Sequence, residues 1–175
     1  MRAASFHLPN VSISRPRSDR GRADARGDRY VVQTYGTGEG ARVVYSDADP
    51  YTVEPARRMV EHLPNVLYLS HDVREARSLL ESPEVTEFLG GERRVAIGVS
   101  GISVFLPPDE FRRLLHELYE WAAPGSRLYL TYETKEAGRT TPRMEQFLDV
   151  FRQVGSPYYF HTLEECVELS RPWRI

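Results

Sequence analysis

The pattern of apolar and polar positions predicts alternating strands and helices along most of the chain. Short β-branched or aromatic runs indicate strands. Five of them are expected at Tyr30–Tyr35, Arg42–Ser46, Val66–Leu69, Val95–Val99 and Arg127–Thr131. A last strand is expected near Tyr158–Phe160. Because Val95–Val99 is apolar on both faces, it is typical of a central strand with helices on each side.

Helical periodicity fills the intervals between these strands. Helices are expected over Thr52–His62, Val73–Glu81 and Ser82–Leu89, after Pro107-Pro108, after the cap Thr141, and from Thr162 onward. Two of them have a marked apolar stripe. The stripe residues are Phe111, Leu114, Leu115, Leu118 and Ala122 in one, and Met144, Phe147, Leu148, Phe151 and Val154 in the other.

This alternation predicts an α/β fold, a Rossmann-like and mostly parallel sheet with helices on both faces. A parallel connection needs a crossover of about a dozen residues or more, and the helical intervals supply it. In such folds ligands bind at the carboxyl ends of the strands, so the residues just after each strand are the candidates.

Residues 1–29 differ in composition and pattern from residues 30–175, which we expect to form the Rossmann-like domain. They have no sustained hydrophobic period, and they contain seven Arg against three Asp. We expect a basic arm, extended or mobile and exposed to solvent. An arm that contacts phosphate groups or embraces a second subunit is the alternative.

Composition excludes several classes of protein. A hydrophobic content of 41% with a net charge of −2 is typical of a soluble globular protein and makes nucleic acid an unlikely partner. The single Cys166 excludes an intrachain disulfide and a cysteine metal cluster, and the histidines lack metal-binding spacing. No apolar run is long enough for a membrane span, so we expect a cytoplasmic protein without a bound metal.

Acidic or small residues follow three of the expected strands. Asp47 follows Arg42–Ser46, where a carboxylate can accept hydrogen bonds from a ribose diol, although Asp47 or Asp49 can instead cap the next helix. Asp72 follows the next strand, where an adenine amino group needs an acceptor. Ser100 and Gly101 follow the central strand and allow a ligand to approach the backbone closely.

Residues 41–175 resemble the S-adenosylmethionine (SAM) dependent methyltransferases, specifically a bacterial family of little-defined substrate range. The resemblance rests on Ala41–Pro50, Asp72–Arg74, the run from Glu84 to Ile97, and Pro124–Leu128. It implies the class I methyltransferase fold, SAM as the cofactor, and specific site residues. These are Asp47 at the ribose with its neighbour Ala48, Asp72 on the adenine side with its neighbour Val73, and Ser100 and Gly101 as the floor of the site.

The chain departs from the family pattern at two places. The family's usual Leu-His pair after the fourth strand is replaced by Gly101-Ile102-Ser103. The run Gly36–Gly40 looks like the family's first cofactor loop, but it lies seven residues before Asp47, where no crossover helix fits. We therefore expect a hairpin loop that joins Tyr30–Tyr35 and Arg42–Ser46, and a fold that is N-terminally incomplete.

The favoured function is transfer of a methyl group from SAM to a small-molecule acceptor, with catalysis mainly by positioning. No catalytic residue is assigned; His71 is a possible general base. Tyr132 and Glu133 face the expected cleft, where they contact the acceptor or merely finish a loop. The alternative is a noncatalytic relic that serves as a dimerisation or partner-binding scaffold, with homodimers as its expected form. A nicotinamide oxidoreductase is a weaker third option.

Overall fold

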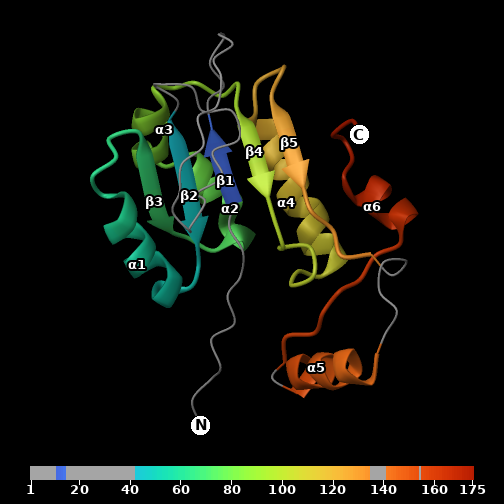
Figure 1. Cartoon of the computed structure of the whole chain (residues 1–175). Helices are drawn as coiled ribbons and strands as arrows, with labels where there is room; N and C mark the ends of the chain where they lie inside the picture. The colour runs from blue at the N-terminus through green and yellow to red at the C-terminus, as the bar shows by residue number, and fades with distance from the viewer. Residues whose placement is uncertain (1–10, 15–41, 135–140, 154) are drawn as a thin grey trace, which may run out of the picture.

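The computed structural model describes residues 11–14, 42–134, 141–153 and 155–175. Five strands form one sheet in the order β3-β2-β1-β4-β5 (Figure 1). The strands are β1 (Val11–Ser14), β2 (Val43–Asp47), β3 (Val66–Ser70), β4 (Ala96–Val99) and β5 (Arg127–Leu130). The helices are α1 (Pro50–Val60), the 3₁₀ turn η1 (Val73–Glu75), α2 (Ala76–Leu80), α3 (Pro83–Leu89), α4 (Pro108–Trp121), α5 (Pro142–Gln153) and α6 (Leu163–Leu169).

Four strands of the sheet run in the same direction. β2 pairs with β3 in parallel, β4 pairs with β5 in parallel, and β1 is antiparallel to both β2 and β4. The carboxyl ends of β2, β3, β4 and β5 therefore meet at one edge of the sheet (Figure 1). The prediction of a mostly parallel Rossmann-like α/β fold is confirmed, together with the helices in the expected intervals.

The antiparallel neighbour of β2 does not come from the expected segment. β2 is paired on one side with β1 and on the other with β3, so no edge of it is left for a hairpin with Tyr30–Tyr35. The neighbour is β1, which lies within the range 1–29 that we assigned to an arm. A strand of four residues is too short to give a recognisable alternation of apolar and polar positions, so the sequence did not reveal it. Tyr30–Tyr35, Gly36–Gly40 and the rest of the arm lie outside the described residues.

One face of the sheet is covered by α1, which begins where Asp49 accepts a hydrogen bond from the amide of Tyr51. Pro50 is in the first turn, where its missing N–H costs no helical hydrogen bond. The residues buried between α1 and the strands form what we call the small cluster: Val43, Tyr45, Val53, Val60 and Tyr68. The Tyr45 and Tyr68 rings stack with centroids 5.8 Å apart.

The opposite face carries a larger core, which we call the large cluster. It joins buried residues of β2, β3 and β4 to α2, α3 and α4, with Leu128 and Leu130 of β5 packed against it. The apolar stripe expected in α4 is buried at Phe111, Leu114, Leu115 and Leu118. α3 ends at Gly90, whose left-handed backbone with φ of 67° suits a residue without Cβ.

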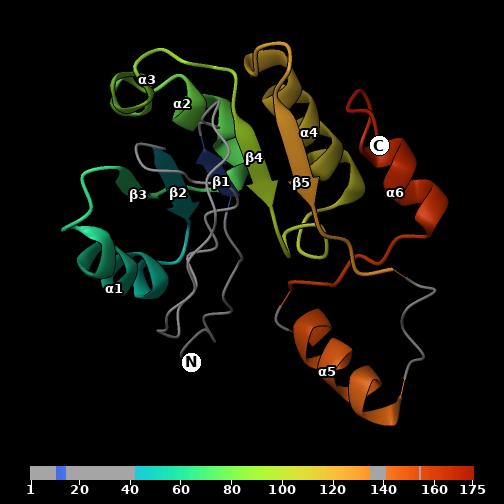
Figure 2. The ribbon, with the colours of Figure 1, turned by 45° about the horizontal axis from the view of Figure 1, so that its top comes forward.

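The C-terminal part departs from two predictions. α5 buries Leu148 and Phe151 as expected, but Met144 and Phe147 are 43% and 45% exposed, so their inward placement was wrong; Val154 lies outside the described residues. α5 stands apart from the sheet, beyond the carboxyl ends of β4 and β5 (Figures 1 and 2), and its Val150 is also 49% exposed.

The segment Tyr158–Phe160 is extended but is not a strand, because it has no ladder partner among the described residues. Its rings pack against one another and against α5 instead. Beside it, Thr134 and His161 form an isolated parallel bridge, and the Tyr159 amide donates to the Val104 carbonyl at 2.8 Å. The prediction of a strand here was wrong, because aromatic residues are common in strands and also in clusters of packed rings such as this one.

Candidate functional site

The sheet brings the sequence-predicted site residues to one edge. Asp47 is in register with Ser70, two residues before Asp72. Ser46 of β2 and Val99 of β4 are both in register with Val11 of β1, which lies between these two strands. The ends of β2 and β4 are therefore level with each other, and Ser100 follows the end of β4. With neighbouring strands about 4.8 Å apart, the Asp47 and Ser100 backbones are separated by roughly 10 Å.

The structure assigns different tasks to the two acids after β2. Asp49 is the N-cap of α1, and Asp47 is not. Asp47 is only 5% exposed, and its Oδ1 accepts a hydrogen bond of 2.8 Å from the Asp49 amide. This bond fixes the turn that contains Ala48. A carboxylate has about four lone-pair positions and can accept several hydrogen bonds at once.

Asp72 lies at the neighbouring strand end and caps η1. Its carboxylate accepts a hydrogen bond from the Arg74 amide at 2.9 Å and is 3.3 Å from the Arg74 guanidinium. Arg74 also contacts Glu110 at the start of α4, and Val73 packs partly against the large cluster. The Asp72 side chain is 43% exposed at this edge.

His71 connects the two strand ends through its backbone. Its amide donates to the Asp47 carbonyl at 2.9 Å. Its ring Nε2 lies 2.8 Å from the Glu75 carbonyl oxygen and 3.2 Å from the Ser78 hydroxyl. Because the same ring nitrogen is engaged locally, the geometry favours a structural role over the general base that we considered.

Small residues after β4 form a turn that is fastened to the end of β5. Gly101 has a left-handed φ of 65°, a conformation that other residues rarely adopt. Its amide donates to Thr131 Oγ1 at 2.7 Å. Thr131 Oγ1 also lies 3.4 Å from the Ser100 hydroxyl, so both floor residues are tied to β5. This use of Thr131 was missed, because nothing in the spacing reveals which hydroxyl crosses between strands.

Tyr132 belongs to the core rather than to the open edge. Its ring packs edge-on against Phe111 and His161, and its hydroxyl is 2.9 Å from the Ser170 hydroxyl. Burial raises the pKa of Tyr132 to about 12, although the hydrogen bond with Ser170 opposes the rise. Of the two residues proposed to face the cleft after β5, Glu133 alone is exposed.

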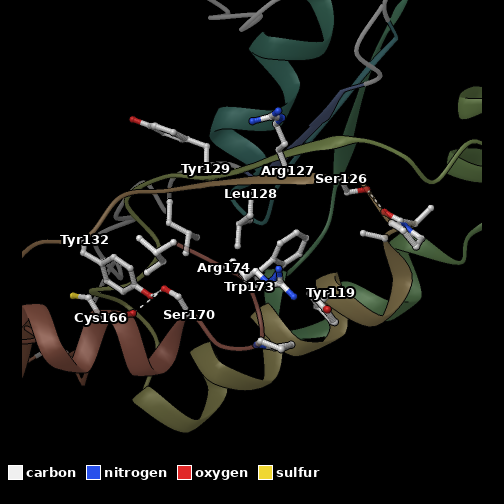
Figure 3. A pocket seen from close by; sticks show the side chains of 17 residues that line it. Tyr119, Ser126, Arg127, Leu128, Tyr129, Tyr132, Cys166, Ser170, Trp173 and Arg174 are labelled. Carbon is white, nitrogen blue, oxygen red and sulfur yellow. Dashed lines mark hydrogen bonds between the residues drawn. The ribbon is translucent and has the colours of Figure 1, made fainter.

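A groove of about 1010 Å³ runs along the outer edge of β5 (Figure 3). Its lining includes Leu128, Leu130 and Tyr132 on one side and Ser170 and Trp173 on the other. None of the sequence-predicted cofactor residues lines it. Its position follows from β5 being an edge strand of the described sheet, whereas the predicted site lies at the strand ends.

Two kinds of feature are absent from the residues that the structure describes. No group of three or more His, Cys, Asp or Glu side chains there is arranged to hold a metal ion. Among the same residues, no helix combines the length and the apolar character needed to cross a bilayer.

Comparison with known proteins gives a matching family model and several similar solved structures. A family model described as S-adenosyl methyltransferase matches residues 31–171. The crystal structure of a "putative methyltransferase" from Thermobifida fusca YX is similar, with a TM-score of 0.63 and 24% sequence identity. The similarity covers 76% of this chain and 49% of that one, so this chain spans about half the length of its neighbour. No curated protein matches the chain.

Proposed function

The chain belongs to the S-adenosyl methyltransferase family, whose cofactor is SAM, and on that premise we propose that it binds SAM at the carboxyl ends of β2, β3 and β4 and transfers its methyl group to a small-molecule acceptor. The observation that carries the proposal is the buried carboxylate of Asp47, oriented by the Asp49 amide at the end of β2. Ligands of such sheets occupy this edge.

Asp47 suits the ribose because a carboxylate accepts hydrogen bonds from two adjacent hydroxyl groups. Asp72 offers an acceptor for the adenine amino group from the neighbouring strand, with Val73 beside it as an apolar contact. Ser100 and Gly101 supply a floor without bulky side chains. The residues present therefore fit the adenosine half of the cofactor, whereas the described residues offer no loop for its methionine half.

Bound SAM supplies an activated methyl group on a positively charged sulfur. The task of this chain is then to hold the acceptor in line with that methyl group and to keep water from competing for it. Alignment needs rigid strand ends. The hydrogen bonds from His71 to Asp47 and from Gly101 to Thr131 provide rigidity on the two sides of β1.

Calorimetry on the full chain with SAM and S-adenosylhomocysteine tests this proposal. Asp47→Asn keeps an oxygen for the Asp49 amide but removes the charge that strengthens hydrogen bonds to the ribose. We expect S-adenosylhomocysteine to bind the variant roughly 10- to 100-fold more weakly, as loss of a hydrogen bond to a charged group implies.

Asp49→Asn is the matched control, since Asn is also a good N-cap. Its affinity should stay within about twofold of wild type, the range of a surface substitution. An unmodified chain that binds neither compound at millimolar concentration would contradict the proposal.

A second candidate is the noncatalytic scaffold, supported by the antiparallel direction of β1. β1 begins at the carboxyl edge, where Val11 pairs with Ser46 and Val99, and ends at the opposite edge, so the strand runs away from the candidate site. This candidate is favoured if the unmodified chain forms dimers in light scattering yet binds no S-adenosylhomocysteine. A monomer that binds the compound excludes it.

A further inference from the structure

We infer that the acceptor sits at the carboxyl ends of β4 and β5, on the carboxylate of Glu133 and against a neighbouring group of aromatic rings, and that it is a flat, uncharged or cationic molecule with a hydroxyl or amine nucleophile. This inference rests on the proposed function, because it places the acceptor beside the floor of the SAM site. It assigns a role to Glu133 that the cofactor does not require.

The position of Glu133 is set by hydrogen bonds between the loops that follow β4 and β5. Ser103 is completely buried, and its hydroxyl lies 3.3 Å from the Thr131 carbonyl oxygen and 3.4 Å from Oε2 of Glu133. Gly101, two residues before Ser103, is tied to the side chain of the same Thr131. Glu133 is therefore held next to the proposed cofactor floor by one carboxylate oxygen, although the residue as a whole is exposed.

A group of aromatic rings with Tyr158 at its centre lies near the loop that carries Glu133, because Thr134 forms a bridge with His161 and Phe105, two residues after Ser103, packs against Tyr158. The ring centroid of Tyr158 is 4.6 Å from Phe151, 4.9 Å from Phe105, 5.6 Å from Phe147 and 6.0 Å from Phe160. Phe147 stays 45% exposed on α5, which lies beyond the ends of β4 and β5 (Figure 2). The half-exposed ring of Phe147 can stack on a flat acceptor.

Electrostatics link the rings to Glu133. The pKa of Tyr158 is raised above its usual value, first by burial and then by the negative charge of Glu133. The phenol of Tyr158 thus remains protonated at neutral pH and can donate to an acceptor, while Glu133 can accept from one. The same charge repels carboxylates and phosphates, so anionic acceptors are disfavoured.

A lone pair on the acceptor oxygen or nitrogen attacks the methyl carbon, a new C–O or C–N bond forms, and the S–CH₃ bond breaks with its electron pair left on sulfur. The proton of the acceptor passes to the Glu133 carboxylate and from there to water. S-adenosylhomocysteine and the methylated acceptor are the products.

Three probes that share a phenol ring but differ in charge test the inference: tyramine, p-cresol and 4-hydroxyphenylacetate. Their dissociation constants are measured by NMR titration with the full chain saturated with S-adenosylhomocysteine. We expect tyramine to bind most tightly and 4-hydroxyphenylacetate most weakly. The two should differ by about tenfold, because attraction to and repulsion from one exposed carboxylate each contribute up to about 1 kcal/mol.

Glu133→Gln should remove this charge preference and leave the affinity for S-adenosylhomocysteine unchanged. Glu145→Gln is the matched control, an exposed acid of α5 that pairs with Arg152 and lies outside the ring group. In Glu145→Gln the ratio of the dissociation constants of 4-hydroxyphenylacetate and tyramine should equal that of wild type. Binding of S-adenosylhomocysteine without any charge preference, or a preference that survives Glu133→Gln, overturns this inference alone. Absence of S-adenosylhomocysteine binding counts against the proposed function instead.

Discussion

The two faces of the sheet are covered to very different extents. On one face the large cluster extends from β3 to β5 beneath α2, α3 and α4. On the other, the small cluster lies under α1 at β2 and β3 only. Because side chains alternate along a strand, Ala96, Arg127 and Tyr129 point to this second face, and Figure 3 shows Arg127 and Tyr129 directed away from Leu128. Among the described residues, no helix covers them.

This difference indicates that the large cluster contributes most of the stability of the fold, whereas the second face contributes less. Burial of a large apolar side chain contributes about 1.5–3 kcal/mol, and most such side chains lie in the large cluster. The second face is buried near β2 and β3, where Asp47 lies, and near β4 and β5 no helix of the described residues covers it. Substitutions and pH titration can test whether the two faces differ in their contribution to stability.

The largest effect is expected from Leu115→Ala in the large cluster. Leu115 is completely buried on α4, and its truncation should lower the free energy of unfolding by about 2–5 kcal/mol in urea titrations. Val53→Ala in the small cluster is the counterpart, since Val53 is 2% exposed but loses fewer carbons. An equal or larger loss for Val53→Ala would show that the small cluster is not the weaker core.

A smaller effect is expected at alkaline pH, because each cluster holds a tyrosine. Burial raises the pKa of Tyr45 and of Tyr132 to about 12. The unfolded chain loses these protons near pH 10 while the folded chain keeps them, so stability is complete below pH 10 and falls as pH rises toward 12. At pH 11 the loss should be about 1.4 kcal/mol for each tyrosine, and it approaches about 2.7 kcal/mol only above pH 12.

Tyr45→Phe isolates the share of the small cluster in this loss. The hydroxyl of Tyr45 is buried and has no hydrogen-bond partner among the described residues, so its removal should change stability little at pH 7. Between pH 9 and pH 11 the variant should lose less stability than wild type in the same urea titrations. Identical pH slopes for the two proteins would contradict the assignment.

The smallest effect is expected on the open part of the second face. Tyr129 is 49% exposed, and Tyr129→Thr keeps a side chain suited to a strand. The free energy of unfolding should change by no more than about 0.5 kcal/mol. A loss of 2 kcal/mol or more, on the order of a truncated core residue, would show that this face is covered in solution.

Local patterns in the sequence were sufficient for most of the fold. The stripe of α4, the proline-opened helices and the apolar run of β4 each reflect one element's own burial, so they are readable without partners. The positions of Asp47 and Asp72 at neighbouring strand ends followed from the same elements. Capping is equally local: Thr162 and Glu165 form the expected capping box.

Features that depend on distant pairing could not be predicted. β1 is identified only by its partners in β2 and β4, and the tie from Gly101 to Thr131 joins two loops through a single hydroxyl. The exposure of Met144 and Phe147 was missed for a related reason. An apolar stripe shows which side of a helix is apolar, but not whether another element covers all of it.

The central position of β1 has a consequence for how the molecule folds. The β2–β3 and β4–β5 pairs are each joined by a local crossover, so either can form with a modest loss of chain entropy. β1 must instead bring Val11 beside Val99, the widest separation along the chain of any strand pairing in the described sheet. Closing such a long loop is slow. The pairing of β1 with β2 is about as local as that of β4 with β5, so we expect β3, β2 and β1 to form one unit, β4 and β5 another, and the sheet to be completed last between β1 and β4.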